Sequence, residues 1–328
     1  MIELLKPAAG ECVPLLQEKH LAYIREPKND PTSRVDWLNL REVQDDLSYP
    51  RAVEFSFLPK IDGEVHLISP DGKVEVIPAK NGKASAVNLL IGAGYQWYVI
   101  AGGEVSEKRS FETDPQVPRM LYVEGISNVR DFGGFPTADG NHRIKQGWIF
   151  RTSELDTHVE ITEAGKQTLL ELGVRVDLDV RGIKDEPRCP ILDQTRVKWL
   201  NYPLAAYGEI FCERQIALYG ESYKLLADSR NYPLIVHCWG GIDRTGCWLY
   251  ILGGMLGVSE DLLGLDYEMS SFSRWNRRSR LSEQFGEFLK GLYQYGDTLQ
   301  EACIGFMRAG GVTDTEMDAI RKILLEEL

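Results

Sequence analysis

The sequence predicts two domains: an all-β sandwich over residues 1–116 and, over residues 120–328, an α/β domain whose parallel sheet is flanked by helices. Three observations lead to this prediction. Short runs of alternating apolar and polar residues, separated by turn signals, fill the first third of the chain. Two prolines then fall within residues 114–118, where they disfavour both a helix and a central strand and indicate a linker. Beyond this linker, strand patterns alternate with helix patterns, which is typical of a parallel sheet covered on both faces.

The first domain is expected to consist of short strands with aromatic centres. Asp-Gly turn signals at 61–63 and 70–72 separate several of them. Residues 95–98, with the sequence Tyr-Gln-Trp-Tyr, precede a charged strand and resemble the later strands of fibronectin type III or immunoglobulin-like domains. Trp97 is expected in the core of this domain rather than in a ligand site. The predicted strands are 52–58, 64–69, 73–78, 86–90, 95–101 and 105–113.

The second domain alternates strands with helices. The first helix has Thr162 near its N-cap and Gly173 as its stop. The final segment, 314–328, reads as an amphipathic terminal helix. The predicted strands are 147–151, 174–180, 197–203 and 234–237, and the other predicted helices are 162–172, 216–226 and 244–256.

Composition and charge limit the classes of partner. The chain has 328 residues, 43% of them hydrophobic, and a formal net charge of −12. A protein this acidic repels nucleic acid and anionic membranes at long range, so we expect neither as a partner. No apolar run is long enough to cross a bilayer, and residues 1–16 lack the pattern of a signal peptide.

The six cysteines are too sparse for a disulfide scaffold. None belongs to a C-x-x-C pair, and none has the spacing of zinc ligands. We therefore expect no metal and no cofactor, and a reducing, cytoplasmic location.

Residues 233–246, with the sequence PLIVHCWGGIDRTG, carry the strongest chemical signal. They predict a buried strand, a loop from Cys238 to Arg244, here called the signature loop, and the start of a helix. Successive backbone N–H groups in such a loop point inward as an anion nest, and the helix dipole adds partial positive charge. Gly240 and Gly241 permit the backbone angles that the nest requires. The predicted phosphate-binding loop is completed by Trp239, Ile242 and Asp243.

Each polar residue of this segment has an expected role. The helix N-terminus favours the nucleophilic thiolate of Cys238. The planar fork of Arg244 can bind two phosphate oxygens at once. The hydroxyl of Thr245 can donate to the sulfur and assist its departure, while His237 is expected to support the loop. The competing interpretation is a buried cysteine followed by a glycine turn, which the flanking strand and helix disfavour.

The segment from His237 to Gly246 resembles the signature loop of the protein tyrosine phosphatase superfamily. Further motifs resemble those of its bacterial, lipid-phosphatase-like "tyrosine phosphatase 3" group, and the resemblance covers roughly residues 120–328. It implies a cysteine-dependent phosphatase fold and hydrolysis through a phosphocysteine intermediate. The further motifs are Asn-Val-Arg-Asp-Phe-Gly-Gly at 128–134, Gly-Trp-Ile-Phe-Arg-Thr-Ser at 147–153, Asp-Val-Arg at 179–181, and Asp266-Tyr267 followed by Ser270.

The leaving oxygen of a phosphomonoester needs a proton, usually from an aspartic acid. The stretch 204–209, where related dual-specificity enzymes place this residue, contains no Asp. The resemblance implies Asp179, which would lie at the carboxyl end of a parallel strand. Asp177 and Asp243 are the alternatives.

Other residues have predicted roles around the site. Asn128 and Asp131 are expected to brace the signature loop through hydrogen bonds. Arg181, Arg130 and Arg151 are candidates for the pocket wall, and Arg181 is the strongest of them because charged residues on loops are usually solvated. The alternative for each is a structural ion pair. Cys247 is expected to pack in the core. A basic run is expected to form a solvated helix face, with attraction of an anionic substrate as the alternative. It consists of Arg274, Arg277, Arg278 and Arg280.

The "tyrosine phosphatase 3" group that this chain resembles often has a lysine at the position of Ile242. A lysine there would add a charge for multiply phosphorylated inositol rings, so its absence favours phosphotyrosine or a small monoester. We therefore expect a protein-tyrosine or dual-specificity phosphatase acting on a phosphorylated protein or small phosphomonoester. The alternatives are a phosphoinositide or inositol phosphate phosphatase, a phosphate-binding module without turnover, and a sulfurtransferase.

Overall fold

The structure is a computed structural model that describes residues 1–25, 46–182, 184–185, 188–275 and 278–328. It divides into two compact units. One comprises Met1–Leu21 and Pro50–Tyr122, and the other comprises Val123–Leu328 together with the described parts of Ala22–Tyr49. The antiparallel β region and the helix-flanked parallel strands confirm the predicted fold class, while the two-domain division with its linker stays a prediction.

Two sheets form the first unit. One has the strand order β1-β3-β6, and the other has the order β2-β9-β7-β4-β5, with β8 paired to β7. The strands of these sheets are β1 (Glu3–Lys6), β2 (Cys12–Val13), β3 (Val53–Leu58), β4 (Gly63–Ile68), β5 (Val74–Ala79), β6 (Lys83–Ala86), β7 (Gly94–Ala101), β8 (Glu104–Val105) and β9 (Arg109–Thr113). The short strand β10 (Arg119–Met120) follows β9 along the chain and belongs to neither sheet.

Aromatic side chains from both sheets form the core of this unit. The ring of Phe55 on β3 lies 5.1 Å from that of Trp97 on β7 and 6.0 Å from that of Phe111 on β9. Trp97 is completely buried, which confirms its predicted place in the core. Such edge-to-face contacts are favourable arrangements of aromatic rings.

Some predicted strands of this unit are wrong. Residues 86–90 form no strand beyond Ala86, because Asn88 adopts a left-handed backbone with φ 65°. The single strand predicted over 105–113 is two strands, β8 and β9. Strands β1 and β2 were not predicted.

The second unit is built on a sheet whose strands β11, β13, β16, β14 and β15 lie side by side in that order. β16 is parallel to β13 and β14, and β15 is parallel to β14. A separate antiparallel pair joins β12 to the last strand, β17. These strands are β11 (Arg130–Asp131), β12 (His142–Ile144), β13 (Ile149–Thr152), β14 (Val176–Asp179), β15 (Lys198–Asn201), β16 (Leu234–His237) and β17 (Leu325–Glu327).

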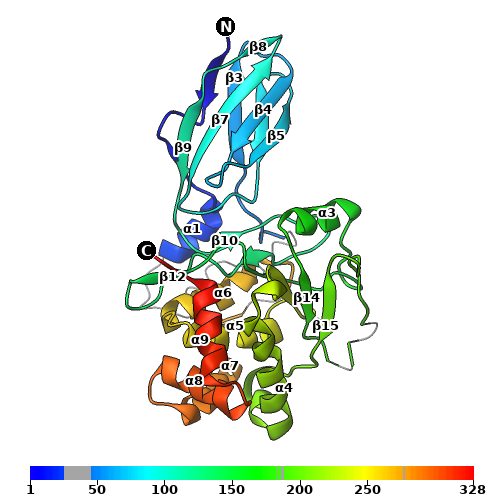
Figure 1. The fold of residues 1–328 in the computed structure, drawn as a ribbon, viewed down its shortest axis with the longest axis vertical. Helices are drawn as coiled ribbons and strands as arrows, with labels where there is room; N and C mark the ends of the chain where they lie inside the picture. Colours follow the sequence, from blue (N-terminus) through cyan, green and yellow to red (C-terminus); the bar gives the residue numbers. More distant parts are fainter. Residues whose placement is uncertain (26–45, 183, 186–187, 276–277) are drawn as a thin grey trace. The chain divides into compact units, whose positions relative to one another are not determined.

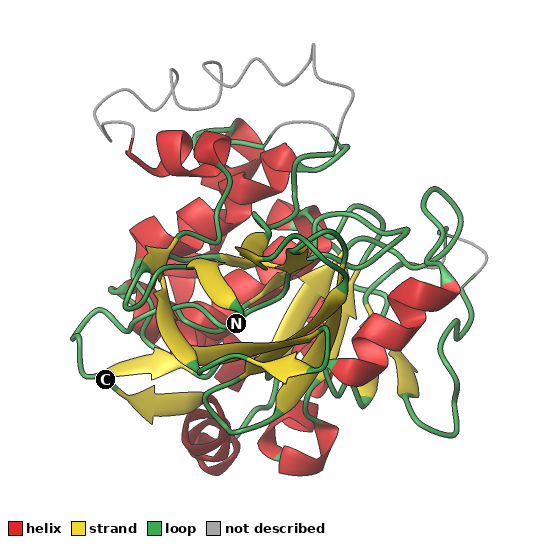
Figure 2. Cartoon of the chain, turned by 90° about the horizontal axis from the view of Figure 1, so that it is seen from above, coloured by secondary structure: helices red, strands yellow, loops and turns green. Residues whose placement is uncertain are grey.

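Figure 1 shows α4, α5, α7, α8 and α9 gathered as one group, with α3 apart from them. Figure 2 shows the helices and strands of the chain coloured by type. The helices are α1 (Glu18–Arg25), α3 (Glu163–Glu171), α4 (Glu213–Lys224), α5 (Asp243–Met255), α6 (Glu260–Met269), α7 (Glu283–Leu292), α8 (Leu299–Ala309) and α9 (Asp314–Leu324). The 3-10 helices are η1 (Tyr207–Phe211), η2 (Leu225–Ala227), η3 (Ser229–Asn231), η4 (Ser270–Phe272) and η5 (Tyr293–Tyr295).

Several helix ends follow local sequence signals. The Thr162 side chain accepts a hydrogen bond from Gly165 N and caps α3, and Gly173 follows that helix with φ 81°. Helices α8 and α9 begin with capping boxes at Thr298 and Thr313. Among the described residues, we find no helix with both the length and the apolar character needed to span a membrane.

Candidate active site

Three parallel strands end together at the signature loop. β16 lies between β13 and β14, and His237 at its end pairs with Thr152 on one side and Asp179 on the other. The chain then enters the loop at Cys238 and reaches α5 at Asp243. Carboxyl ends of parallel strands beside a helix N-terminus are where open α/β sheets bind ligands.

The loop is held by donors that lie outside it. Three consecutive loop carbonyls accept hydrogen bonds from groups on neighbouring segments. Because the C=O and N–H of a trans peptide point in opposite directions, the next three N–H groups face away from these donors, which is the arrangement of an anion nest. The bonds are Glu154 N to Trp239 O at 2.8 Å, Asn128 Nδ2 to Gly240 O at 2.9 Å and Arg151 Nη2 to Gly241 O at 2.6 Å.

Gly241 is required by this packing. Its φ of 64° lies in the left-handed region, and an added Cβ would lie 2.1 Å from the Thr152 carbonyl oxygen. Only glycine satisfies both the backbone angle and the close approach to β13. The neighbouring Gly240 has more room, because a Cβ there would lie 3.2 Å from its nearest side-chain atoms.

The predicted nucleophile and its two partners lie in and beside the loop. Cys238 is 2% exposed. Burial lowers the pKa of the Arg244 guanidinium. The interactions with Cys238, Asp185 and Asp243 outweigh burial and raise the pKa. The hydroxyl of Thr245 is buried and has no hydrogen-bond partner within the described chain, so it can donate to a sulfur or phosphate oxygen.

A cavity of about 900 Å³ opens beside Arg244, and we call it the Arg244 cavity. Its wall carries charges of both signs. The charged residues that line it are Lys184, Asp185, Glu209, Arg214, Asp243, Arg244, Arg278 and Glu287.

Asp185 is a site residue that the sequence analysis missed. One of its carboxylate oxygens contacts Arg244 Nη1 and also accepts a hydrogen bond from Gly182 N at 2.8 Å. Burial raises the pKa of Asp185, but the hydrogen bond and charge of Arg244 hold the pKa below its ordinary value. The available sequence signal was its position six residues after Asp179, just beyond the carboxyl end of β14.

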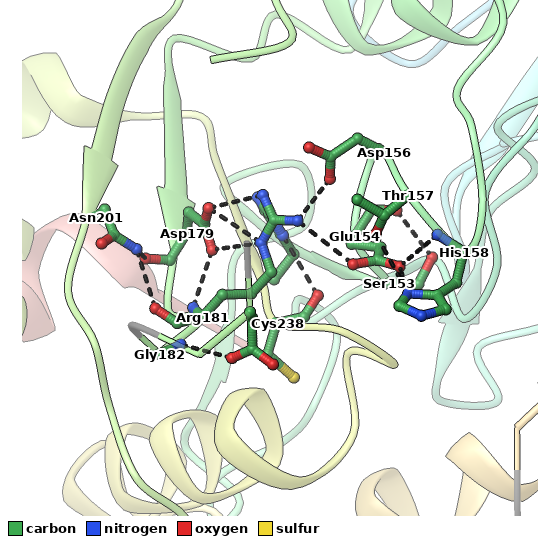
Figure 3. Close-up of polar contacts among 12 residues, drawn as sticks. Ser153, Glu154, Asp156, Thr157, His158, Asp179, Arg181, Gly182, Asn201 and Cys238 are labelled. Atoms are coloured by element: carbon green, nitrogen blue, oxygen red, sulfur yellow. Dashed lines mark hydrogen bonds and ion pairs between the residues drawn. The ribbon is translucent and has the colours of Figure 1, made fainter. Parts of the chain in front are cut away.

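Asp179, the predicted proton donor, lies in a buried network with Arg181. The Arg181 Nη2 to Asp179 Oδ2 distance is 2.9 Å, and Arg181 Nη1 also pairs with Asp156 at 2.6 Å and Glu154 at 3.3 Å. Figure 3 shows Arg181 between Asp179 on one side and the other two carboxylates on the other. Burial raises the pKa of Asp179, but His237 and Arg181 outweigh it, so the pKa lies below its ordinary value.

Asp177 and His237 form a buried ion pair under the loop. The distance from His237 Nε2 to Asp177 Oδ1 is 2.9 Å, and both side chains are almost completely buried. Burial lowers the pKa of His237, but Asp177 and Asp179 together raise it to about 9. His237 is therefore an imidazolium at neutral pH. It directly precedes Cys238 in the chain.

Asp243, the alternative donor within the loop, faces the Arg244 cavity and has two partners. Arg278 pairs with it through Nε at 2.6 Å and Nη2 at 2.9 Å, and the Tyr207 hydroxyl donates to the same carboxylate. The Tyr207 hydroxyl also lies 2.5 Å from that of Tyr267. Burial raises the pKa of Asp243, but Arg278 outweighs it, so the pKa is lowered.

The prediction of a solvated helix face for the basic run is wrong for two of its members. Arg278 pairs with Asp243, and Arg280 pairs with Glu268 at 2.7 Å. Arg274 lies 5.5 Å above the ring of Trp275, and Arg277 falls outside the described residues.

Two arginines and one aspartate tie the loop to α6. Arg130 Nε lies 2.9 Å from Asp266 Oδ1, and Arg151 Nη1 contacts the other oxygen of the same carboxylate. All three side chains are buried, so Arg130 and Arg151 have the structural ion-pair role that was the alternative to a place in the pocket wall.

The predicted bracing residues make different contacts. Asn128 bonds the loop carbonyls of Gly240 and Gly241. The Asp131 carboxylate accepts hydrogen bonds from the backbone N–H groups of Gly133 at 2.7 Å and Gly147 at 2.6 Å. Asp131 thereby fixes the turns that lead into β13, which in turn supplies donors to the loop.

Two other predicted residues also have clear surroundings. Trp239 is 42% exposed, and its ring lies 4.4 Å from that of His158 and 6.0 Å from that of Trp275. Cys247 is buried in α5, as expected, and burial raises the pKa of its thiol to about 12.

A comparison with known proteins matches most of the second unit. A family model described as "Tyrosine phosphatase family" matches residues 121–326. No curated protein matches the chain. The matched range contains β13, β14, β16, the signature loop and every residue that lines the Arg244 cavity.

Proposed function

Because the chain belongs to the tyrosine phosphatase family, we propose that it hydrolyses phosphomonoesters through a phosphocysteine intermediate on Cys238. The observation that carries this proposal is the signature loop, whose carbonyls are bound from outside while its N–H groups are left for an anion at the start of α5. A cytoplasmic, reducing location is part of the proposal, since the reaction needs a free thiol.

The proposed roles follow from charge and position. The N–H groups of the loop and the Arg244 guanidinium hold the phosphoryl oxygens. The Cys238 thiolate attacks the phosphorus atom, and the phosphoryl group passes to sulfur. The Thr245 hydroxyl, which has no hydrogen-bond partner among the described residues, is placed to stabilise the sulfur when water later releases phosphate. The family resemblance implies Asp179 as the proton donor, with Asp177 and Asp243 as alternatives.

We propose a phosphotyrosine-containing protein, or a protein phosphorylated on several residue types, as the substrate. Ile242 is buried at the N-cap of α5 and adds no charge to the loop. A second candidate class is an inositol phosphate or phosphoinositide, because Lys184 and Arg214 line the cavity beside Arg244. Relative kcat/KM values for a phosphotyrosine peptide, a phosphoserine peptide and inositol phosphates distinguish the two classes.

Replacement of the nucleophile tests the proposed reaction. We expect wild-type protein to hydrolyse p-nitrophenyl phosphate and Cys238→Ser to lose turnover by about 10³-fold or more, because a serine hydroxyl ionises far less readily than a thiol. Cys212→Ser is the matched control, since Cys212 is an exposed free cysteine. Stopped reactions with labelled substrate should trap phosphate on the wild-type chain.

The alternatives give different results in the same assay. A phosphate-binding module would bind inorganic phosphate without turnover at any pH. A sulfurtransferase would release thiocyanate from thiosulfate and cyanide. Full activity in Cys238→Ser would rule out a phosphocysteine on this residue.

A further inference from the structure

The phosphate-binding arginine already holds a carboxylate. Arg244 Nη1 contacts Asp185, whose side chain is 26% exposed and lines the Arg244 cavity. The carboxylate is also fixed by the Gly182 N–H at 2.8 Å. Asp185 is thus a carboxylate in direct contact with the guanidinium that a phosphoryl group must bind in the proposed reaction, and it lines the cavity beside that guanidinium.

Three other carboxylates near the site are paired with groups other than the phosphate-binding Arg244. Asp179 is completely buried and bonded through both oxygens to Arg181. Asp177 is paired with His237. Asp243 lines the cavity, but both of its oxygens are engaged by Arg278. A substrate can bind without breaking any of these pairs, so none of them responds directly to its arrival.

We propose that Asp185 is the catalytic residue that protonates the leaving oxygen and then activates water, an inference that rests on the proposed phosphatase function. Its position supports both tasks, because it lies on the cavity side of Arg244 and keeps part of its surface in contact with solvent. A proton donor must reach the leaving group and later exchange protons with water.

Substrate binding would change the charge around Asp185 in the direction that an acid needs. The charged groups that face it are Arg244 and Arg181, and Arg244 is the one in contact. A phosphoryl group that takes over Arg244 removes this cation and brings a negative charge nearby. Both changes favour the protonated carboxyl. The other charged residues of the cavity wall, which contribute a background field, are Lys184, Arg214, Arg278, Asp243, Glu209 and Glu287.

The proton balance of the two steps is complete. In the first step a P–S bond forms at Cys238, the P–O ester bond breaks, and the leaving oxygen takes the proton of Asp185. The products are an alcohol, phosphocysteine and the Asp185 carboxylate. In the second step water attacks phosphorus and gives a proton to Asp185, the P–S bond breaks, and inorganic phosphate and the Cys238 thiolate are released.

Leaving-group dependence tests this role with Asp185→Asn. A poor leaving group such as phenolate, whose conjugate acid has a pKa of about 10 like tyrosine, depends strongly on a proton donor. We expect kcat for phenyl phosphate to fall by about 10²-fold or more. The loss should be much smaller for p-nitrophenyl phosphate, because nitrophenolate leaves without a proton. The high-pH decline of wild-type kcat, caused by loss of this proton, should disappear in the variant.

Matched variants separate this role from a structural one. Asp193 is an exposed carboxylate that, like Asp185, lies in the segment after β14. Asp193→Asn should therefore behave as wild type. Asp185→Asn should bind inorganic phosphate, measured as a competitive inhibitor, at least as tightly as wild type, because it removes a competitor for Arg244. That binding also demonstrates a folded site if turnover is too low to measure.

Two results would overturn the assignment. One is equal loss of kcat for both esters, and the other is weaker phosphate binding by Asp185→Asn, since both indicate that Asp185 only positions Arg244. A leaving-group effect found in Asp179→Asn or Asp243→Asn, and not in Asp185→Asn, would move the role to that residue. Turnover that survives Cys238→Ser would instead contradict the proposed function itself, whatever Asp185 does.

Discussion

At the residue scale, the buried pair of His237 and Asp177 links the charge beneath the signature loop to pH. His237 has a raised pKa of about 9, whereas an unfolded histidine has one of about 6.5. A group whose pKa is raised by folding stabilises the fold fully below its unfolded pKa. That stabilisation is lost as the pH rises through the folded pKa. The window for this pair is therefore pH 6.5 to somewhat above 9.

We predict that Asp177→Asn flattens the pH dependence of unfolding in this window. In the wild type, His237 should contribute a fall of at most about 3 kcal/mol in the free energy of unfolding between pH 6.5 and 9.5. Asp179 and Arg181 still face the imidazole in the variant, so a smaller slope remains. Urea unfolding at half-unit pH steps measures the free energy of unfolding of both proteins. In the difference between wild type and variant, the titration of the groups that the two proteins share cancels.

Asp193→Asn serves as the reference for this series, because its carboxylate is exposed and bonded to Thr195. It should reproduce the wild-type slope. Identical slopes in wild type and Asp177→Asn would contradict the assignment of the raised His237 pKa to its pairing with Asp177.

The sequence identified the residues of the signature loop but not the partners of each charge. Cys238, Gly241 and Arg244 follow from local spacing, because a strand, a loop and a helix start within fourteen consecutive residues. The pairing of Arg244 with Asp185, and of Asp243 with Arg278, joins residues 59 and 35 positions apart. No local pattern encodes such contacts, since they depend on how the strand ends and loops meet in space.

At the element scale, α6 anchors the signature loop through one carboxylate. Asp266 is buried on α6 and accepts from Arg130 on β11 and Arg151 on β13. Arg151 in turn donates to the Gly241 carbonyl at 2.6 Å. One aspartate therefore compensates two buried guanidinium groups and fixes the donor that orients the loop.

Asp266→Asn should be strongly destabilising. Neutralising the shared partner leaves two buried cations without compensation, and we expect a loss of about 3–5 kcal/mol in the free energy of unfolding. Asp318→Asn is the surface comparison, because Asp318 is exposed and pairs with Arg321 within α9. That change should cost about 0.5 kcal/mol or less. Chemical denaturation of both variants makes the measurement, and equal small effects would show that water compensates the two arginines.

Elements with a strong local signal were predicted well, and the others were missed for identifiable reasons. β16 is an apolar run, and a glycine-containing loop separates it from α5. The predicted bounds of both elements therefore agree closely with the structure. The terminal helix ends at Leu324, not at 328, because residues Leu325–Glu327 pair with β12. An amphipathic pattern cannot reveal that its last residues complete a strand pair about 180 positions away. Helices α6, α7 and α8 were not predicted.

At the scale of the whole molecule, each unit has its own aromatic core. Trp97 packs against Phe55 in the first unit, and Trp248 stacks on Tyr223 at 5.2 Å in the second. Both tryptophans are completely buried. Two separate cores are what independently stable domains require, which supports the two-domain proposal derived from the sequence.

Matched tryptophan deletions test whether the two units unfold and function separately. Trp97→Ala should cost about 3–5 kcal/mol in the unfolding of the first unit, because it leaves a large cavity in that core. Hydrolysis of p-nitrophenyl phosphate at 25 °C should stay within about twofold of wild type, since every proposed catalytic group lies in the second unit.

Trp248→Ala removes the same side chain from α5, where its Nε1 donates to Ser222 Oγ at 2.9 Å. It should reduce both stability and turnover, because α5 carries Arg244 and its N-terminus forms the anion site. Calorimetry paired with kcat/KM for both variants gives the comparison, and a proportional loss of activity in Trp97→Ala would show that the first unit takes part in catalysis.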